Sequence, residues 1–421
     1  MPRIKRYDYL IVGGGIAGVT AAETIRQKDT SSSICIVSKE SAPLYSRVFL
    51  PHYIRGKIPR EKVFLRTLDD YTDKNIDVLV GKEIVVANFD MHEVRLSDKG
   101  ILNYGKLLIA TGSTPLRWRI IGEGLEPILR LQTIDDADRA EQVLRELKGK
   151  GDALVVGGGF IALEFLESAV AYGYKAHLLI KEKRFFAGQL DELGWGILEQ
   201  NFARHGITSH TESEVKKLEQ DDKGILIAHT STGETIKGVW LGLGIGVERN
   251  YGTFQGGGLK IGRGIVVNEY LELNVPDVWA AGDVAEVYYS KIGKSQLVGN
   301  WNSAFMQGRT AGINMAALDA DNRVAFDAVP TYSINSLGYN ITMVGDTSAG
   351  DDIETVARVW PDGISYERFF LRGGILQGAI LINRFADKPS IAKLIKNNAD
   401  FSEKRNNLHD PDYDITKFSA S

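Results

Sequence analysis

Two glycine-rich loops carry the residues of this sequence best suited to binding a nucleotide. The loops are Gly13-Gly14-Gly15-Ile16-Ala17-Gly18 and Gly157-Gly158-Gly159-Phe160-Ile161-Ala162. Each follows an apolar run typical of a β-strand and precedes a helical pattern, which is the setting of a dinucleotide-binding fingerprint. Unpaired N–H groups at the start of a helix attract a pyrophosphate. Two such loops in one chain therefore predict two bound dinucleotides.

The first loop has an acidic partner at the expected distance. Glu40 stands 22 residues after Gly18, at the end of the predicted strand Ile34–Val37. A carboxylate in that position accepts hydrogen bonds from the ribose hydroxyls of an adenosine. We place Ser38, Lys39 and Glu40 in this predicted adenosine site. The alternative is that Glu40 is an exposed glutamate at a strand end.

The second loop lacks such an acid. The corresponding strand end reads Lys181-Glu182-Lys183-Arg184, so Lys181 stands where the ribose acceptor is expected. Cations there can pair with a 2′-phosphate, which favours NADPH. The alternative is a solvated charged turn beside a site that binds NADH through its pyrophosphate. Both interpretations remain open.

Three further side chains have types suited to redox chemistry on a cofactor. Asp283 follows Gly282 and a buried-looking strand, so it can accept a hydrogen bond from a ribityl hydroxyl. Trp301 opens a predicted helix whose N-terminus would stabilise negative charge on a reduced flavin, although core packing is the alternative. Glu164 lies in an apolar first helical turn, where a carboxylate is costly unless it is paired or beside a cationic ring. It either lies beside a nicotinamide or complements the helix dipole.

The elements that must position these residues form two similar units and a third, different one. Around the first loop we predict a helix over 20–27 and the strand Ile34–Val37, and around the second a helix over 161–172 and a strand over 176–180. A helix over 300–318 follows the Gly282-Asp283 motif. From Pro330 the pattern changes to strands and one helix over 390–397, and the polar tail beyond Glu403 is expected to be loosely held.

The resulting fold class is α/β, with two Rossmann-like dinucleotide-binding domains and a C-terminal α+β domain. The predicted boundaries are 1–118 and 247–326 for a discontinuous first domain, 119–246 for the second and 327–421 for the third.

Composition excludes several classes of function. A net charge of −4 with 25% charged residues provides no electrostatic footprint for nucleic acid or an anionic membrane. No apolar run reaches membrane-spanning length, and we expect no signal peptide and a cytoplasmic location. Cys35 is the one cysteine, inside a strand-like run, so neither a disulfide nor a thiol-rich metal site can form within the chain. No metal site is expected.

These motifs, in this order, resemble the pyridine-nucleotide disulfide oxidoreductase-like flavoproteins from Tyr7 to about Asn397. Besides the two loops, the resemblance rests on Ala110-Thr111-Gly112-Ser113-Thr114-Pro115, Leu243-Gly244-Ile245-Gly246 and Ala280-Ala281-Gly282-Asp283. It implies FAD at the first loop and NADH or NADPH at the second. It adds Ile84, Ala110, Thr111 and Gly112 to the FAD site and Gly246 to the nicotinamide site.

The segment Tyr45-Ser46-Arg47-Val48-Phe49-Leu50 narrows the resemblance. Val48 stands where the single-cysteine members carry their redox thiol, so thiol chemistry is not expected. The segment is similar to that of ferredoxin, rubredoxin and putidaredoxin reductases and the flavin-binding part of nitrite reductases, which implies that Arg47 contacts FAD. The lysine that these proteins carry near flavin N5 is His52 here, which is either a flavin neighbour or a surface histidine. Trp301 matches a tryptophan near the flavin.

The function that this resemblance implies is transfer of electrons from NAD(P)H through FAD to a small electron-carrier protein such as rubredoxin or ferredoxin. Glu164, His52 and Trp301 are the residues expected to affect hydride transfer or flavin potential. The alternatives are a peroxide-forming NAD(P)H oxidase, an apoptosis-inducing-factor-like module, and a subunit whose acceptor site lies on another chain. A monomer or homodimer is expected.

Overall fold

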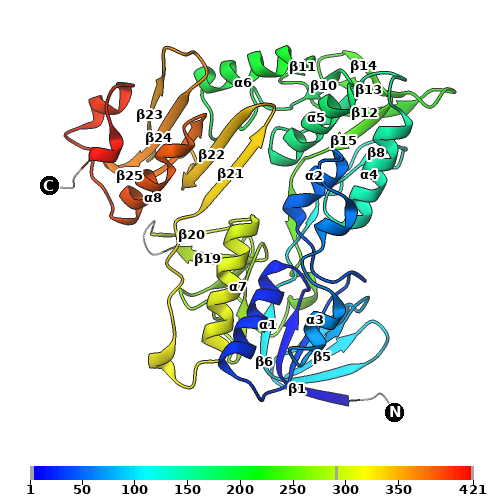
Figure 1. The fold of residues 1–421 in the computed structure, drawn as a ribbon, viewed down its shortest axis with the longest axis vertical. Coiled ribbons are helices and arrows are strands. Elements are labelled where there is room, and N and C mark those ends of the chain that lie inside the picture. Colours follow the sequence, from blue (N-terminus) through cyan, green and yellow to red (C-terminus); the bar gives the residue numbers. More distant parts are fainter. Residues whose placement is uncertain (1–3, 290–292, 419–421) are drawn as a thin grey trace. The chain divides into compact units, whose positions relative to one another are not determined.

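The computed structural model describes residues 4–289 and 293–418, which form two compact units (Figure 1). The first unit comprises Met1–Val48, Pro59–Thr114 and Glu248–Ala328. The second comprises Phe49–Ile58, Pro115–Val247 and Val329–Ser421. The short strands β7 (Ser113–Pro115) and β16 (Val247–Arg249) fall where the chain passes between units.

The first unit is built on a mixed sheet of seven strands. Its central strands are parallel and run in the order β3-β2-β1-β6, with β18 also paired to β6, while β5 and β4 extend the sheet in antiparallel fashion. The strands are β1 (Ile4–Val12), β2 (Ile34–Val37), β3 (Ile76–Leu79), β4 (Ile84–Asn88), β5 (Glu93–Leu96), β6 (Ile101–Ile109) and β18 (Val278–Ala280). Because β18 comes from much later in the sequence, the unit is discontinuous.

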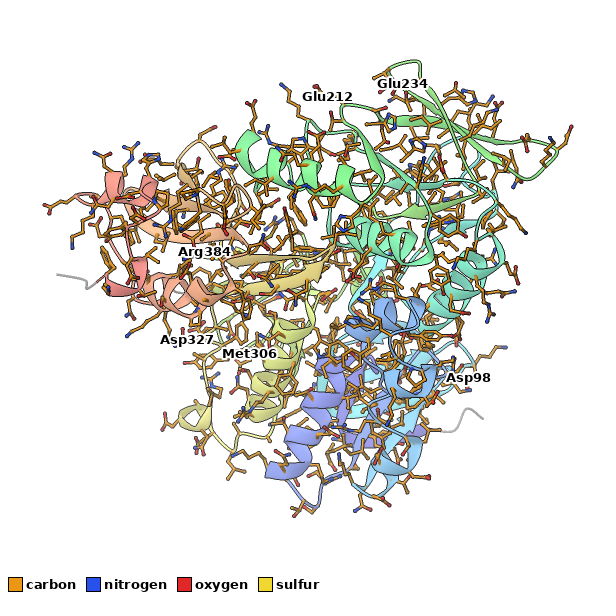
Figure 2. All side chains as sticks on the ribbon, turned by 45° about the horizontal axis from the view of Figure 1, so that its top comes forward. Asp98, Glu212, Glu234, Met306, Asp327 and Arg384 are labelled. Atoms are coloured by element: carbon orange, nitrogen blue, oxygen red, sulfur yellow. The ribbon has the colours of Figure 1, made fainter. Side chains whose placement is uncertain are left out.

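Helices α1 (Ile16–Lys28) and α7 (Trp301–Met315) lie side by side in this unit (Figure 1). Glycines permit the close approach, since a Cβ atom at Gly308 would lie 2.2 Å from the Ala17 carbonyl oxygen. The first helix begins four residues before the predicted start at residue 20, because Gly18 lies inside its first turn. Helix α7 ends at Met315, whereas the predicted helix ends at residue 318. Met306 on α7 is partly exposed (Figure 2).

The remaining elements of the first unit are short. One is the helix α3 (Leu68–Thr72). The others are the strands β17 (Ile265–Val267), β19 (Ala285–Tyr289) and β20 (Lys294–Gln296), and these three strands form a separate small sheet.

The second unit repeats the strand–helix–strand arrangement of the first in a five-stranded parallel sheet of order β11-β10-β9-β15-β8. These strands are β8 (Ile128–Leu129), β9 (Ala153–Val156), β10 (Ala176–Leu179), β11 (Ile207–His210) and β15 (Trp240–Leu243). The helices are α2 (Leu50–Ile54), α4 (Ile134–Glu146), α5 (Phe160–Tyr172) and α6 (Glu192–Arg204). An antiparallel sheet contains β12 (Val215–Gln220), β13 (Leu226–Thr230) and β14 (Thr235–Gly238).

The C-terminal part of the second unit is an antiparallel sheet of order β21-β22-β25-β24-β23, accompanied by one helix. Its elements are β21 (Thr331–Ser336), β22 (Tyr339–Gly345), β23 (Glu354–Val359), β24 (Tyr366–Arg372), β25 (Ile375–Ile382) and α8 (Lys388–Lys396). The predicted fold class is therefore confirmed.

The prediction of a loosely held tail is wrong for the described residues 404–418. Leu408 and Ile415 are buried there, in two short 3₁₀ helices, Arg405–His409 and Ile415–Lys417. The Arg358 guanidinium donates to the carbonyl oxygens of Asp410 and Tyr413, each at 2.9 Å. Isolated apolar residues in a polar stretch have no periodicity, which is why the sequence pattern missed this packing.

Residues 49–58 belong to the second unit, although the chain on both sides of them belongs to the first. Two hydroxyl groups attach this segment: Tyr53 donates to Asp138 Oδ1 at 2.8 Å, and Tyr172 donates to the Ile54 carbonyl oxygen at 2.9 Å. His52 therefore belongs to the second unit. Within 4–289 and 293–418, no helix is long and apolar enough to cross a membrane.

Candidate dinucleotide-binding sites

The start of α1 leaves its backbone N–H groups available for an anion. Gly15 is the N-cap residue, and no side chain caps this helix. A Cβ atom at Gly15 would find nothing within 4 Å, so the loop faces open space. In contrast, Thr67 and Asp70 form a capping box at the start of α3. An uncapped helix start beside open space fits the pyrophosphate that the first loop predicts.

The predicted adenosine residues gather beside this loop. Gly14, Gly15, Ser38, Glu40 and Arg47 line one small pocket. Arg47 Nη2 lies 2.5 Å from Glu40 Oε1, and the Tyr45 hydroxyl donates to Glu40 Oε2. These contacts orient the carboxylate at the rim of the pocket.

Two of the predicted FAD residues lie elsewhere in the first unit. Lys39 is exposed and pairs with Glu83 at 2.8 Å. Ile84 is buried in the hydrophobic core at the start of β4. Neither lines the pocket that contains Glu40.

The other end of the first site brings together segments far apart in sequence. Ser113 Oγ donates to Asp283 Oδ2 at 2.8 Å, and the Gly282 N–H donates to Gln307 Oε1 at 2.7 Å. A Cβ atom at Gly13 would lie 2.1 Å from the Ala110 carbonyl oxygen, so the loop and the end of β6 are in direct contact.

Thr111 and Gly112 directly follow Ala110 at this end of the first site. Thr111 Oγ1 donates to the Asn250 carbonyl oxygen at 2.6 Å, and the Asn250 side chain returns a bond to the Thr111 carbonyl oxygen at 3.0 Å. Gly112 faces open space, since a Cβ atom there would find nothing within 4 Å. Asn250 has no motif around it, so sequence reasoning missed it.

Trp301 is the first residue of α7 and packs, partly buried, against the core of the first unit. Asn300 caps this helix by accepting a hydrogen bond from the Ser303 N–H. The placement of the α7 N-terminus at the flavin stays a prediction.

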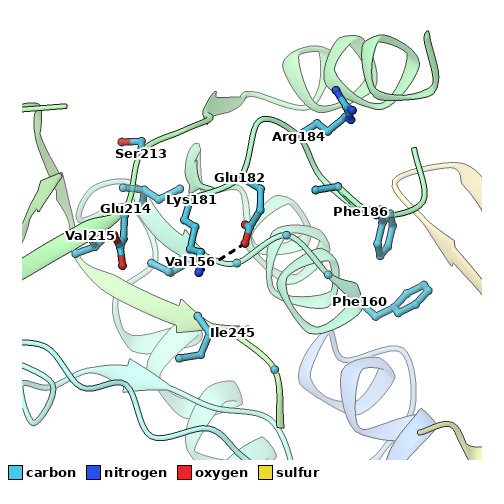
Figure 3. Close-up of a pocket in the computed structure, with 18 of the residues that line it drawn as sticks. Val156, Phe160, Lys181, Glu182, Arg184, Phe186, Ser213, Glu214, Val215 and Ile245 are labelled. Atoms are coloured by element: carbon cyan, nitrogen blue, oxygen red, sulfur yellow. Dashed lines mark ion pairs between the residues drawn. The ribbon is translucent and has the colours of Figure 1, made fainter. Parts of the chain in front are cut away.

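The second glycine loop opens onto a cavity of about 720 Å³ (Figure 3). The predicted residues that line it are Gly157, Gly159, Phe160, Lys181 and Gly246. As at the first loop, the N-cap residue is a glycine, Gly159, which has no side-chain cap, and a Cβ atom there would find nothing within 4 Å. The same fit to a pyrophosphate therefore applies.

Charged side chains of both signs line this cavity. Lys181 Nζ lies 4.0 Å from Glu182 Oε1, and Glu214 lines the same cavity. Arg184 also lines the cavity and is labelled in Figure 3, and its Nε donates to the Leu190 carbonyl oxygen at 2.8 Å. Sequence reasoning missed Glu214, which a search beyond the carboxyl end of β11 would have found. Met343 also lines the cavity and had no sequence signal.

Glu164 lies on α5 in an ion pair that the sequence did not predict. Its Oε2 atom lies 2.7 Å from Nη1 of Arg55, whose side chain is only 2% exposed. Burial raises the pKa of Glu164, and the Arg55 charge opposes that shift. Arg55 Nη2 lies 3.4 Å from His52 Nδ1. Burial lowers the pKa of His52, and the charge of Arg55 lowers it further.

Aromatic rings pack at the start of α5. The Phe160 ring centroid lies 3.8 Å from that of Tyr332 and 4.7 Å from that of Phe186. Burial, followed by the charge of Glu164, raises the pKa of Tyr332. Ile161 is partly exposed beside them.

The structure thus joins two of the three residues expected to affect hydride transfer. Glu164 and His52 belong to one cluster in the second unit, whereas Trp301 belongs to the first unit. Their placement relative to bound cofactors stays a prediction.

Cys35 is fully buried in β2, and burial raises its thiol pKa to about 12. A thiol of this kind is not a nucleophile at neutral pH. Among the residues that the structure describes, no group of histidine, cysteine, aspartate and glutamate side chains is arranged to hold a metal ion.

Comparison with known proteins finds a matching family, related sequences and similar structures. The model of a family described as pyridine nucleotide-disulphide oxidoreductase matches residues 7–308. The NADH-dependent phenylglyoxylate dehydrogenase subunit epsilon of Aromatoleum evansii is 27% identical, over 96% of this chain and 94% of its own. The 3-phenylpropionate/cinnamic acid dioxygenase ferredoxin–NAD(+) reductase component of Photorhabdus laumondii is 26% identical, over 94% and 98% respectively.

A solved structure has a similar fold. Putidaredoxin reductase, in its covalent complex with putidaredoxin, superposes with a TM-score of 0.87 at 23% identity, over 97% of each chain.

Proposed function

Because this chain belongs to the pyridine nucleotide-disulphide oxidoreductase family, we propose that it transfers electrons from NADH through FAD to a small iron–sulfur or rubredoxin-type carrier protein. The observation that carries this proposal is that two helices, α1 and α5, each begin at a glycine-rich loop without a side-chain cap, in a chain whose one cysteine is buried.

The predicted family and its cofactors, FAD and NAD(P)H, are confirmed by the family match and by the relatives, and the protein is an oxidoreductase. When bound, FAD accepts a hydride and releases electrons one at a time. The α1 N-terminus would hold its pyrophosphate, Glu40 its adenosine ribose and Asp283 its ribityl chain. The α5 N-terminus would hold the pyrophosphate of the nicotinamide coenzyme.

The absence of a thiol relay supports direct transfer to a carrier protein. The family resemblance places Val48 at the position of the redox cysteine, and the Cys35 thiol has no exposed surface. The names of relatives point the same way, since one is a ferredoxin–NAD(+) reductase component and another forms a complex with putidaredoxin.

The charges in the second cavity support NADH rather than NADPH. A 2′-phosphate needs cations that are free to pair with it. The cations that line this cavity are Lys181, which lies 4.0 Å from Glu182 Oε1, and Arg184, whose Nε donates to the Leu190 carbonyl oxygen. The carboxylates of Glu182 and Glu214 balance these two cations, so the lining offers no surplus positive charge to a 2′-phosphate.

The proposal is tested by steady-state turnover of the purified holoenzyme with NADH, with and without a rubredoxin or a ferredoxin. We expect fast reduction of a carrier and slow reaction with oxygen, and the same behaviour in the Cys35→Ala variant. Fast peroxide formation with oxygen alone would contradict the proposal and identify an oxidase. Slow turnover with a long-lived NAD⁺ complex and a redox-dependent oligomer would indicate an apoptosis-inducing-factor-like module.

A second candidate function is that of a subunit that exchanges electrons with another chain of a complex. It is favoured by the relative from Aromatoleum evansii, which is named as a subunit and matches nearly the whole chain. Rapid reduction of an artificial dye by NADH, without reduction of any carrier protein, would support this function over the first. Light scattering in the same experiments tests the expected monomer or homodimer.

A further inference from the structure

A buried arginine organises a cluster of charges between α2 and α5 in the second unit. Arg55 Nη1 lies 2.7 Å from Glu164 Oε2 and 3.4 Å from Glu167 Oε2. Its Nη2 lies 3.4 Å from His52 Nδ1. An arginine side chain that is only 2% exposed requires anionic partners, and α5 supplies two of them on successive turns.

The charges of this cluster balance only when the histidine is neutral. Two carboxylates, Glu164 and Glu167, face two cations, Arg55 and Lys57, the latter half-exposed and 3.3 Å from Glu167 Oε1. Protonation of His52 would place a third positive charge against the guanidinium. From β21, Tyr332 also faces Glu164, and it stays neutral because burial raises its pKa.

We propose that Arg55 is the positioning residue for Glu164: its guanidinium holds this carboxylate ionised and oriented on the first turns of α5, and it does so only while His52 is neutral. This inference rests on the proposed function, in which Glu164 acts at the nicotinamide site. A guanidinium keeps its charge when buried more readily than a lysine or histidine would, because its pKa is above about 12.

The acid side of the pH profile depends on two groups of the cluster: His52 and Glu164, whose pKa burial raises. His52 is neutral at neutral pH, because burial lowers its pKa and Arg55 and Lys57 lower it further, opposed by Glu167. As the pH falls through that lowered pKa, the protonated ring repels the guanidinium and loosens its hold on Glu164. The rate of FAD reduction by NADH is expected to fall in the same pH range.

The kinetic test compares Arg55→Gln, Arg55→Lys, Glu164→Gln and the Arg55→Gln/Glu164→Gln double variant by stopped-flow reduction of the holoenzyme with NADH. We expect Arg55→Gln to reduce FAD about 10-fold more slowly and Arg55→Lys to restore part of the rate. The double variant should be no slower than Glu164→Gln, since residues that act as a unit are not additive. Arg145→Gln, at an exposed arginine of α4, is the matched control and should behave as the wild type.

A second test does not depend on turnover. Titration of His52 by NMR, with ring-labelled histidine and His52→Gln for assignment, should move to higher pH in Arg55→Gln because a neighbouring positive charge is removed. An unchanged His52 titration, or wild-type reduction kinetics in an Arg55→Gln protein that retains FAD, would overturn the inference. If NADH and NADPH both fail to reduce the wild type, the proposed function fails, while the titration still decides the role of Arg55. If Arg55→Gln does not fold, slow reduction and a changed pH profile in Arg55→Lys support the inference, and wild-type behaviour overturns it.

Discussion

Replacing Gly159 by alanine should remove nicotinamide binding without harming the fold. Gly159 has φ −134° and ψ −170°, a conformation open to alanine, and its Cβ position has nothing within 4 Å. Alanine there should change the free energy of unfolding by less than about 1 kcal/mol, because it mainly restricts the unfolded chain. The new methyl group instead occupies space that a pyrophosphate would fill.

The expected loss of affinity follows from the hydrogen bonds displaced. A phosphate moved by a methyl group loses one or two charge-assisted bonds from the α5 N-terminus, each contributing about 1.5 to 3 kcal/mol. The loss of one such bond, about 1.5 to 3 kcal/mol, corresponds to about a 10- to 150-fold weaker affinity for NADH, and the loss of a second bond would weaken it further. FAD content should not change, since FAD is assigned to the other loop.

Gly157→Ala is the contrasting variant. Gly157 has φ +128°, and a Cβ atom there would lie 2.2 Å from the Gly244 carbonyl oxygen, about 1 Å closer than ordinary contact. Strain and overlap should destabilise the second unit by about 3 kcal/mol or more. Stopped-flow reduction measures NADH affinity, and thermal melting measures stability. Wild-type NADH affinity in Gly159→Ala, or equal destabilisation in both variants, would refute this reasoning.

Two further predictions concern charge. Lys181→Glu should raise the ratio of kcat/KM for NADH over NADPH about 10-fold, or ~1.4 kcal/mol, and an unchanged ratio would mean that residue 181 does not face the 2′ position. Burial raises the pKa of Glu367 to about 8, although the Arg358 guanidinium lies 2.6 Å from its carboxylate. The folded protein therefore keeps a proton on Glu367 that the unfolded chain releases at about pH 4.3. The free energy of unfolding should then fall as the pH rises from about 5 to 8, by at most about 1.4 kcal/mol per pH unit from this group. Thermal melting across this range should show a shallower decline in Glu367→Gln, and equal slopes would indicate that Glu367 is ionised when folded.

Features set by local backbone chemistry were predictable from the sequence. Glycine loops between an apolar strand and a helix have one common use, so both cradles and the fold class followed from residues 10–18 and 154–162. The predicted start of α1 is too late because the sequence pattern assigns Gly18 to the loop, whereas the helix already begins at Ile16 with Gly15 as its N-cap. The packing of the tail was missed because it depends on Arg358, which lies on a distant strand.

The two sites were only partly predictable, because some of their residues come from distant parts of the sequence. Glu40 and Lys181 end strands that follow the glycine loops, so their places beside the loops follow from spacing along the chain. The other residues that line these two pockets cannot be predicted from that spacing. Glu214 reaches the second cavity through the neighbouring strand β11, and Met343 through the C-terminal sheet.

The sequence by itself determined that two dinucleotides bind and that no disulfide forms within the chain, because these conclusions depend on motifs and on the count of one cysteine. Only the tertiary structure decided which charges remain free to act. It placed the Arg55 guanidinium against the Glu164 carboxylate, although 109 residues of sequence separate them. The physical reason is that a charge acts over a few ångströms of space, and the fold decides which residues come that close.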